Sequence, residues 1–201
     1  LDYEDEDELI ITEEESEYFD KGEEFYENGN FEKAIIEFTK AIEVNSKNAC
    51  NFAYRGIAKN ALENQYSFYS VLEDLDKSID LDPKVETFWV NRAYAKLENN
   101  LIEDGIKDLD TVINLFDDAN VTYFWIRGVW KMEIDDFQGA IEDFNEVIEL
   151  DPNDEEDLLS SIEEKIANYK ENKKINLLYR GNPYSKNTTD NKLENFLTKK
   201  S

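Results

Sequence analysis

The stretch that decides the fold is RGVWKMEIDDFQGAIEDFNEVIELDP, residues 127–152. In its second half Phe137, Ala140, Phe144 and Val147 recur at the three- and four-residue intervals of one helix face. The residues 135–136, Asp-Asp, interrupt the pattern as a turn. The Asp-Pro pair at 151–152 ends it, because proline cannot continue a helix but suits the first turn of the next one. The stretch therefore predicts two helices, over residues 121–134 and 137–150.

The same pattern occurs four times along the chain. It is clearest in GEEFYENGNFEKAIIEFTKAIEVN (residues 22–45) and RAYAKLENNLIEDGIKDLDTVINL (residues 92–115). The small residues Gly22, Gly56, Ala93 and Gly128 are separated by 34, 37 and 35 positions. A second set is separated by 37, 34 and 35 positions: Ala34, Val71, Gly105 and Ala140. A Gly or Ala lets two helices approach closely, so we expect helix pairs that pack at these positions.

These stretches resemble tetratricopeptide repeats, over residues 15–154. The resemblance implies an all-α fold, an α-solenoid (right-handed superhelix) of helix–turn–helix repeats whose first helices line a concave groove. The predicted repeats span residues 15–48, 49–85, 86–120 and 121–154. They follow an acidic mobile arm (1–14) and precede a capping helix (155–173) and a basic tail or linker (174–201). The extra residues of the second repeat are expected in its internal turn, residues 64–70, where insertions cost little.

The two ends of the chain carry opposite charge. Residues 1–17 contain ten acids and no base, and such blocks stay solvated. Residues 155–170 predict an amphipathic helix with one apolar stripe, Leu158, Leu159, Ile162, Ile166 and Tyr169. This helix is expected to cap the last repeat, and a partner-binding helix is the alternative. Residues 170–201 carry eight bases and three acids, so we expect part of 173–185 to dock on the acidic solenoid.

Composition excludes several classes of function. The net charge is -26, from 48 acids and 22 bases, which repels nucleic acids and anionic lipids and attracts basic partners. There is no histidine and one cysteine, Cys50, so imidazole-based catalysis and an internal disulfide are absent. Alternating acids at 74–82 lack the glycine of a calcium loop and lie in a predicted helix. We expect no enzyme activity, metal, cofactor or membrane insertion, and cytoplasmic is only the default location.

In the family, the groove is lined by the first helix of each repeat. Transferring that register predicts a partner-binding groove of Phe19, Tyr26, Ala53, Ile57, Asn60, Val90, Tyr94, Leu97, Trp125, Val129 and Met132. Acids are expected at its rim: Glu23, Glu27, Glu98 and Glu133. Contiguous apolar and aromatic surface marks interaction sites. The groove is therefore expected to bind an apolar and basic peptide or helix, unless the chain's own tail fills it.

A well-known site of this family grips the C-terminal carboxylate of heat-shock chaperones with Lys, Asn and Arg. The matching positions here are Phe19, Glu23, Tyr54, Thr87 and Asn91. They supply no cation, and an anionic peptide terminus would meet an acid. The resemblance therefore does not extend to a carboxylate clamp.

Three arginines, Arg55, Arg92 and Arg127, each precede the small residue of a first helix. They could form a basic ladder for an acidic ligand. The preferred interpretation is structural: at least two should pair with acids that recur in the second helices, Glu37, Asp74, Asp108 and Asp143. Arginine suits such fixed ion pairs because its planar fork donates two parallel hydrogen bonds.

Three functions remain after these exclusions. The leading hypothesis is a protein-binding adaptor with an apolar, acid-rimmed groove. The second is a structural scaffold that self-associates through its tail, its groove or its end. The third is that the chain is the recognition part of a larger protein.

Overall fold

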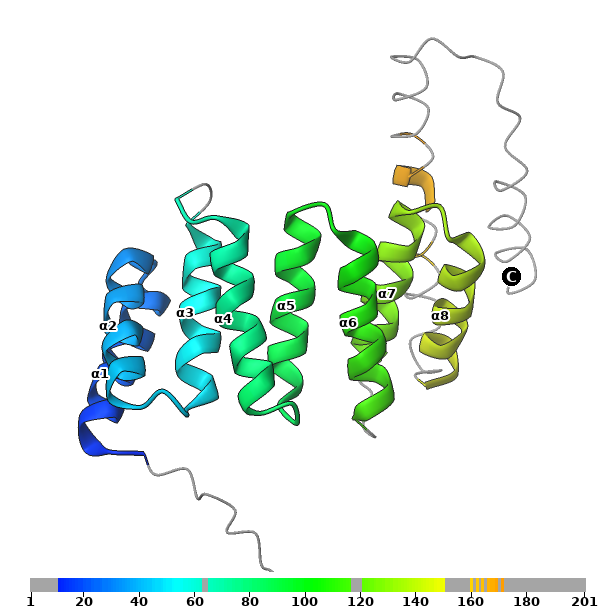
Figure 1. The fold of residues 1–201 in the computed structure, drawn as a ribbon. Coiled ribbons are helices and arrows are strands. Elements are labelled where there is room, and N and C mark those ends of the chain that lie inside the picture. Colours follow the sequence, from blue (N-terminus) through cyan, green and yellow to red (C-terminus); the bar gives the residue numbers. More distant parts are fainter. Residues whose placement is uncertain are drawn as a thin grey trace, which may run out of the picture. The chain divides into compact units, whose positions relative to one another are not determined.

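The computed structural model describes residues 11–62, 65–116 and 121–150, and eight helical positions between 160 and 171. Within these residues there is no β-strand, which confirms the all-α solenoid class (Figure 1). The bounds of the eight principal helices are α1 Glu13–Glu27, α2 Phe31–Val44, α3 Ala49–Ala61, α4 Phe68–Leu81, α5 Glu86–Glu98, α6 Ile102–Leu115, α7 Val121–Glu133 and α8 Phe137–Leu150.

The chain divides into two compact units, which are described separately. The N-terminal unit, Leu1–Leu101, contains α1 to α5. In it α1 packs on α2 and α3 on α4, while α3 also contacts α2 and α5 packs on both α4 and α3. The C-terminal unit, Ile102–Ser201, contains α6 to α8, with α7 packed on both α6 and α8.

Three of the turns inside the repeats share one geometry. Gly29, Asn100 and Asp135 each lie seven residues after the small residue of their repeat and have φ of 72°, 60° and 64°. Glycine, asparagine and aspartate tolerate this left-handed region best. After α1, for example, the Asn30 amide donates to the Phe25 carbonyl and the Gly29 amide to the Tyr26 carbonyl. This pair of bonds satisfies the last carbonyls of the helix and reverses the chain.

The small residues of the repeats pack directly on large ones. A Cβ at Gly22 would lie 2.5 Å from the ring of Phe38, and one at Gly128 would lie 2.7 Å from Phe144. Both phenylalanines are completely buried. The helices of each pair can approach this closely only because glycine leaves the space that the ring fills.

The last acids of the N-terminal acidic run are part of the helical fold. Helix α1 begins at Glu13, two residues before the predicted start of the first repeat at residue 15, with Thr12 Oγ1 accepting from the Glu15 amide. Glu15 itself is completely buried rather than solvated. Its carboxylate accepts hydrogen bonds from the side-chain amides of Asn45, Asn48 and Asn51, at 2.7 to 2.8 Å. These three donors replace the hydrogen bonds that the carboxylate would make with water, and they offset the cost of burying its charge.

A further helix covers the end of the C-terminal unit. Among its described positions, Ile162 and Ile166 are buried in a cluster with Met132, Phe137 and Phe144, and Tyr169 packs against that cluster. The Tyr169 hydroxyl also donates to the Asp135 carboxylate. These contacts fit the predicted capping helix. The expected stripe residues Leu158 and Leu159, most of the acidic arm and the whole basic tail lie outside the described residues.

Candidate peptide-binding groove

The inner surface of the N-terminal unit is formed by α1, α3 and α5 and contains an open cavity of about 320 Å³. We call it the inner cavity. Its lining comes from all three helices and from α4 beneath them: Tyr26, Ile57, Asn60, Ala61, Leu75, Asn91, Tyr94, Ala95 and Glu98. A volume of this size lies at the lower end of the range of ligand pockets.

The repeat register explains why these side chains meet. Ile57 and Tyr94 each follow the small residue of a first helix, Gly56 or Ala93. Because the small residue faces the second helix of the repeat, the next residue is turned toward the inner surface. Tyr94 remains 39% exposed, whereas Leu75 of α4 is 1% exposed and closes the floor. The cavity therefore has an aliphatic floor and an aromatic wall open to solvent.

The polar groups of the inner cavity are two asparagines and one carboxylate. The Asn60 side-chain amide donates a short hydrogen bond to Oε2 of Glu98, which joins α3 to α5. Glu98 forms no ion pair with any described residue. A carboxylate held by an amide alone keeps its charge uncompensated, which favours a cation as its next partner.

A second cavity of about 450 Å³ adjoins the inner cavity and shares Asn60 and Glu98 with it. Its other described lining residues are Lys59, Leu62, Tyr66, Phe68, Val71 and Asn99. Lys59 Nζ is already bound to Asp74 at 2.8 Å and to Ser70 Oγ at 2.9 Å. This lysine is therefore committed to the fold rather than to a ligand.

Of the predicted groove residues, Tyr26, Ile57, Asn60 and Tyr94 line the inner cavity. Val90 and Leu97 are half-buried on α5 outside the cavity lining. Phe19 is also half-buried, with its ring 5.6 Å from that of Phe38 and 5.0 Å from that of Tyr54. Asn91 and Ala95 also line the cavity, although the predicted groove does not include them. The repeat register does place Asn91 among the positions that match the family's carboxylate clamp.

Two predicted groove residues belong to the core instead. Ala53 is 1% exposed and packs with Ile79 and Phe88. Met132 is 3% exposed and lies in the cluster covered by Ile162 and Ile166. In both cases a neighbouring helix covers the position, so neither side chain is available to a partner.

Two more predicted groove residues, Trp125 and Val129, are half-buried against the same C-terminal cluster. The Trp125 ring lies 5.5 Å from that of Phe144. They contribute to the packing of the C-terminal unit, and the inner cavity does not include them.

The position of the family's carboxylate clamp carries the opposite chemistry. The Tyr54 hydroxyl is hydrogen-bonded to the Glu23 carboxylate. Partial burial, followed by this hydrogen bond and the negative charge of Glu23, raises the pKa of Tyr54. An acid and a phenol thus occupy positions where a clamp would need a cation.

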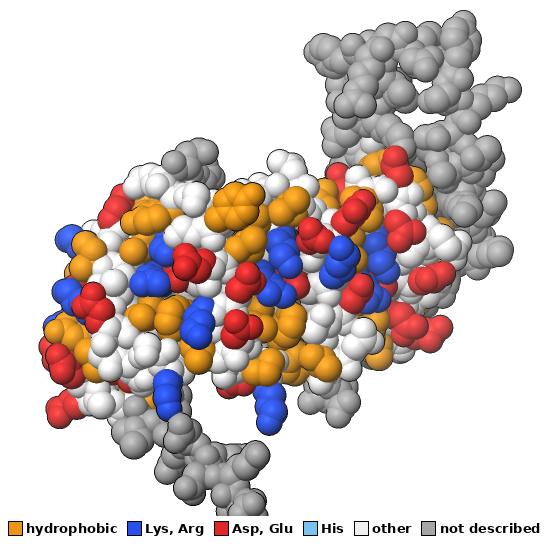
Figure 2. Space-filling view, in the orientation of Figure 1, with side chains coloured by type: hydrophobic (Ala, Val, Ile, Leu, Met, Phe, Trp, Pro, Cys, Tyr) orange, Lys and Arg blue, Asp and Glu red, His pale blue; other side chains and the backbone are white. Residues whose placement is uncertain are grey.

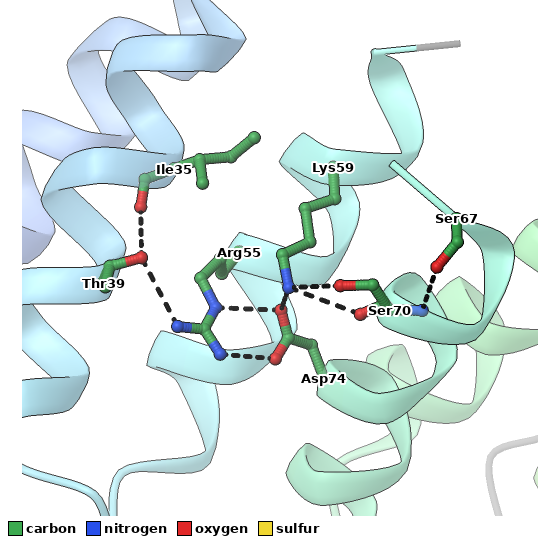
Figure 3. Close-up of polar contacts among 7 residues, drawn as sticks. All are labelled: Ile35, Thr39, Arg55, Lys59, Ser67, Ser70 and Asp74. Atoms are coloured by element: carbon green, nitrogen blue, oxygen red, sulfur yellow. Dashed lines mark hydrogen bonds and ion pairs between the residues drawn. The ribbon is translucent and has the colours of Figure 1, made fainter. Parts of the chain in front are cut away.

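The arginines serve the fold, as expected. Arg55 binds both oxygens of Asp74, with Nη2 at 2.6 Å and Nε at 2.9 Å (Figure 3). Lys59, four residues later, reaches the same carboxylate from the same helix. Asp74 is 2% exposed, so the two cations compensate its buried charge.

The C-terminal unit repeats this arrangement. Arg127 and Lys131 bind Asp143 at 2.6 and 3.0 Å, and Arg127 also binds Asp110 at 2.8 Å. Burial by itself lowers the pKa of Arg127, but the hydrogen bonds and charges of Asp143 and Asp110 outweigh it and raise that pKa. Two of the three arginines therefore pair with the predicted acids, which confirms the structural interpretation.

The same arginines also connect neighbouring repeats. Arg92 binds Asp76 of the preceding helix α4 at 2.7 Å, as Arg127 binds Asp110 of α6. In the first repeat Thr39 occupies the matching position and accepts from Arg55. Figure 2 shows basic and acidic side chains interspersed over the helices of the N-terminal unit, in keeping with these pairs.

The described part of the chain contains no group of three or more acids and cysteines placed to hold a metal ion. No described helix is long and apolar enough to cross a membrane.

The sequence pattern of the tetratricopeptide repeat matches residues 18–48 and 126–154. The TPR repeat-containing protein MJ1428 of Methanocaldococcus jannaschii is 27% identical over 154 residues, which cover 68% of this chain and 25% of that protein. The chain spans less than a third of the length of each curated relative that it matches.

Solved structures show the same fold at low identity. The MamA protein has a TM-score of 0.67 at 15% identity, over 94% of this chain and 91% of that one. The first TPR domain of Spaghetti (RPAP3), bound to the HSP90 peptide SRMEEVD, has a TM-score of 0.56 at 18% identity, over 62% of this chain and 98% of that one. The matched stretches, the repeat spacing and the helix pairs together show that the chain contains tetratricopeptide repeats.

Proposed function

We propose that the chain is a protein-interaction module that binds a segment of a partner protein along the inner surface of α1, α3 and α5. The observation that carries the proposal is the open inner cavity, with Ile57 and the partly exposed Tyr94 beside the polar side chains of Asn60 and Glu98. Aromatic residues with adjacent hydrogen-bonding groups are typical of binding surfaces. Tetratricopeptide-repeat proteins are in general interaction modules, and we propose no reaction for this one.

The partner segment is expected to be apolar and basic. The chain carries a net charge of -26, and its inner surface exposes acids such as Glu27 and Glu98. Opposite charge on a partner speeds association and selects against acidic competitors. The RPAP3 domain binds an acidic peptide, SRMEEVD. Because Glu23 and Tyr54 occupy the clamp position here, we expect this chain to reject that peptide.

The test is fluorescence anisotropy with two labelled peptides, SRMEEVD and its basic counterpart SRMKKVK. Only the basic peptide should bind the full chain. Tyr94→Ala should weaken its binding about tenfold, since aromatic contact residues contribute strongly. The matched control is Tyr69→Ala, because Tyr69 lies on α4 and is 83% exposed.

Two results would contradict the proposal. Binding of SRMEEVD in preference to SRMKKVK would show that the chain binds acidic peptides, as a carboxylate clamp does. Equal losses of peptide affinity in Tyr94→Ala and Tyr69→Ala would show that the peptide does not bind specifically at the inner surface. Light scattering on the same samples tests the remaining alternative, because a self-associating scaffold would show a mass that rises with concentration.

A further inference from the structure

We infer that the inner cavity is a pocket for one cationic side chain, an arginine or lysine of the partner segment, with Glu98 as its counter-ion. The inference rests on the proposed function and says which group of the partner enters the cavity. Among the described lining residues, Glu98 carries the only charge at neutral pH. A cation that enters therefore meets an attractive charge and no repulsive one.

Glu98 is held in place before any ligand arrives. Its Oε2 accepts from Asn60, and its other oxygen, Oε1, has no partner among the residues that the structure describes. A carboxylate that is fixed by one hydrogen bond loses less freedom when it forms the next. Lys59, which lines the adjoining cavity with Glu98, is bound to Asp74, and so is Arg55. They are therefore not available to neutralise Glu98.

The walls of the inner cavity suit the rest of a long basic side chain. Tyr26 is braced by the ring of Phe31, with the ring centroids 5.3 Å apart. Tyr26 and Tyr94 are the two aromatic residues of the lining, and tyrosine rings attract cations. Ile57 and Leu75 offer aliphatic surface to the methylene stem of a lysine or arginine. Aromatic, aliphatic and anionic surface thus meet in one cavity.

The test uses a labelled peptide, acetyl-Gly-Ser-Leu-X-Leu-Ser-Gly-amide, in which X is arginine, lysine, norleucine or glutamate. Anisotropy titrations with the full chain give the dissociation constants. The arginine or lysine peptide should bind about tenfold more tightly than the uncharged norleucine peptide, as expected for a cation that gains both ring and carboxylate contacts. The glutamate peptide should bind more weakly than the norleucine peptide.

Two variants test whether Glu98 causes the preference for a cationic peptide. Glu98→Gln should weaken the arginine and lysine peptides about fivefold and leave the norleucine peptide within about twofold. Glu73→Gln is the matched control, because Glu73 is exposed on α4 and its loss changes the net charge equally. It should leave all four peptides unchanged.

The possible failures are distinguishable. If all four peptides bind alike and Tyr94→Ala weakens all of them, the groove is real and the cation pocket is wrong. If Glu73→Gln acts as strongly as Glu98→Gln, the preference comes from the overall field and the pocket is again overturned. If no peptide binds, or Tyr94→Ala affects none, the proposed function fails, and the pocket fails with it.

Discussion

Asn60 in the N-terminal unit and Met132 in the C-terminal unit occupy the same place in their repeats, four residues after Gly56 or Gly128. Their surroundings differ. Asn60 lines the open inner cavity, whereas Met132 is 3% exposed and packs in a buried cluster with Ile162 of the further helix. One repeat position thus lines an open cavity in one unit and lies in the core of the other.

The difference comes from the element that lies beside the first helix. Next to α3 lies α5, which presents Tyr94 and Glu98 and leaves space between the side chains. Next to α7 lies the further helix described between residues 160 and 171, whose Ile162 and Ile166 pack against Met132 in one buried cluster. An array of repeats must cover its terminal apolar face, and only the faces inside the array can remain open to a partner.

The largest expected effect concerns a feature that both units contain, a buried aspartate bound by an arginine and a lysine. Asp74→Ala and Asp143→Ala should each lower the free energy of unfolding by about 3–5 kcal/mol, because each leaves two partly or fully buried cations without the buried carboxylate that they share. Urea denaturation of the full chain measures both.

The control for these two variants is Glu17→Ala, which removes an exposed pair with Lys21 and should leave the unfolding midpoint unchanged. A large loss from Asp143→Ala with none from Asp74→Ala would show that the ion pairs are not equivalent in the two units.

A second prediction addresses the difference between the units directly. Met132→Ala should cost about 2–5 kcal/mol of stability, because it opens a cavity beneath Ile162. Asn60→Ala, at the same repeat position, should stay within about 0.5 kcal/mol. Thermal and urea unfolding of the two variants give the comparison. Equal costs would mean that Asn60 is as much a part of the core as Met132.

The smallest effect concerns the reactivity of Cys50, which lies exposed near the start of α3. Desolvation by its neighbours, and then the negative charges of Asp82, Glu15 and Glu23, raise the pKa of its thiol. Since the thiolate is the nucleophile, a raised pKa lowers the reactive fraction at any pH below it. Iodoacetamide should therefore alkylate the folded chain more slowly than it alkylates N-acetylcysteine between pH 7 and about 9.

The control for Cys50 is the same chain in urea, where the rate should approach that of N-acetylcysteine. A folded-state rate equal to the unfolded one would contradict the effect of desolvation and of Asp82, Glu15 and Glu23 on the thiol.

The sequence by itself determined the helices, their pairing within repeats and the pairing of arginines with acids. The reason is periodicity: small residues at a spacing of 34 to 37 must lie at equivalent helix contacts, and opposite charges that recur with them must meet. The left-handed turns of the structure fit this local sequence, since Gly29 and Asn100 are residue types that tolerate a positive φ. All of these features depend on neighbours that are close in the chain or repeated along it.

Only the tertiary structure decided which of these surfaces are open. Glu15 belongs to an acidic run, yet it is buried and hydrogen-bonded to three asparagine amides from the α2–α3 turn and from α3. Ala53 and Met132 fit the groove register, yet neighbouring helices cover them, and Glu98 faces the inner cavity without a cation. Exposure depends on what a neighbouring helix brings to the position. The repeat register sets the direction of a side chain, but not what lies opposite it.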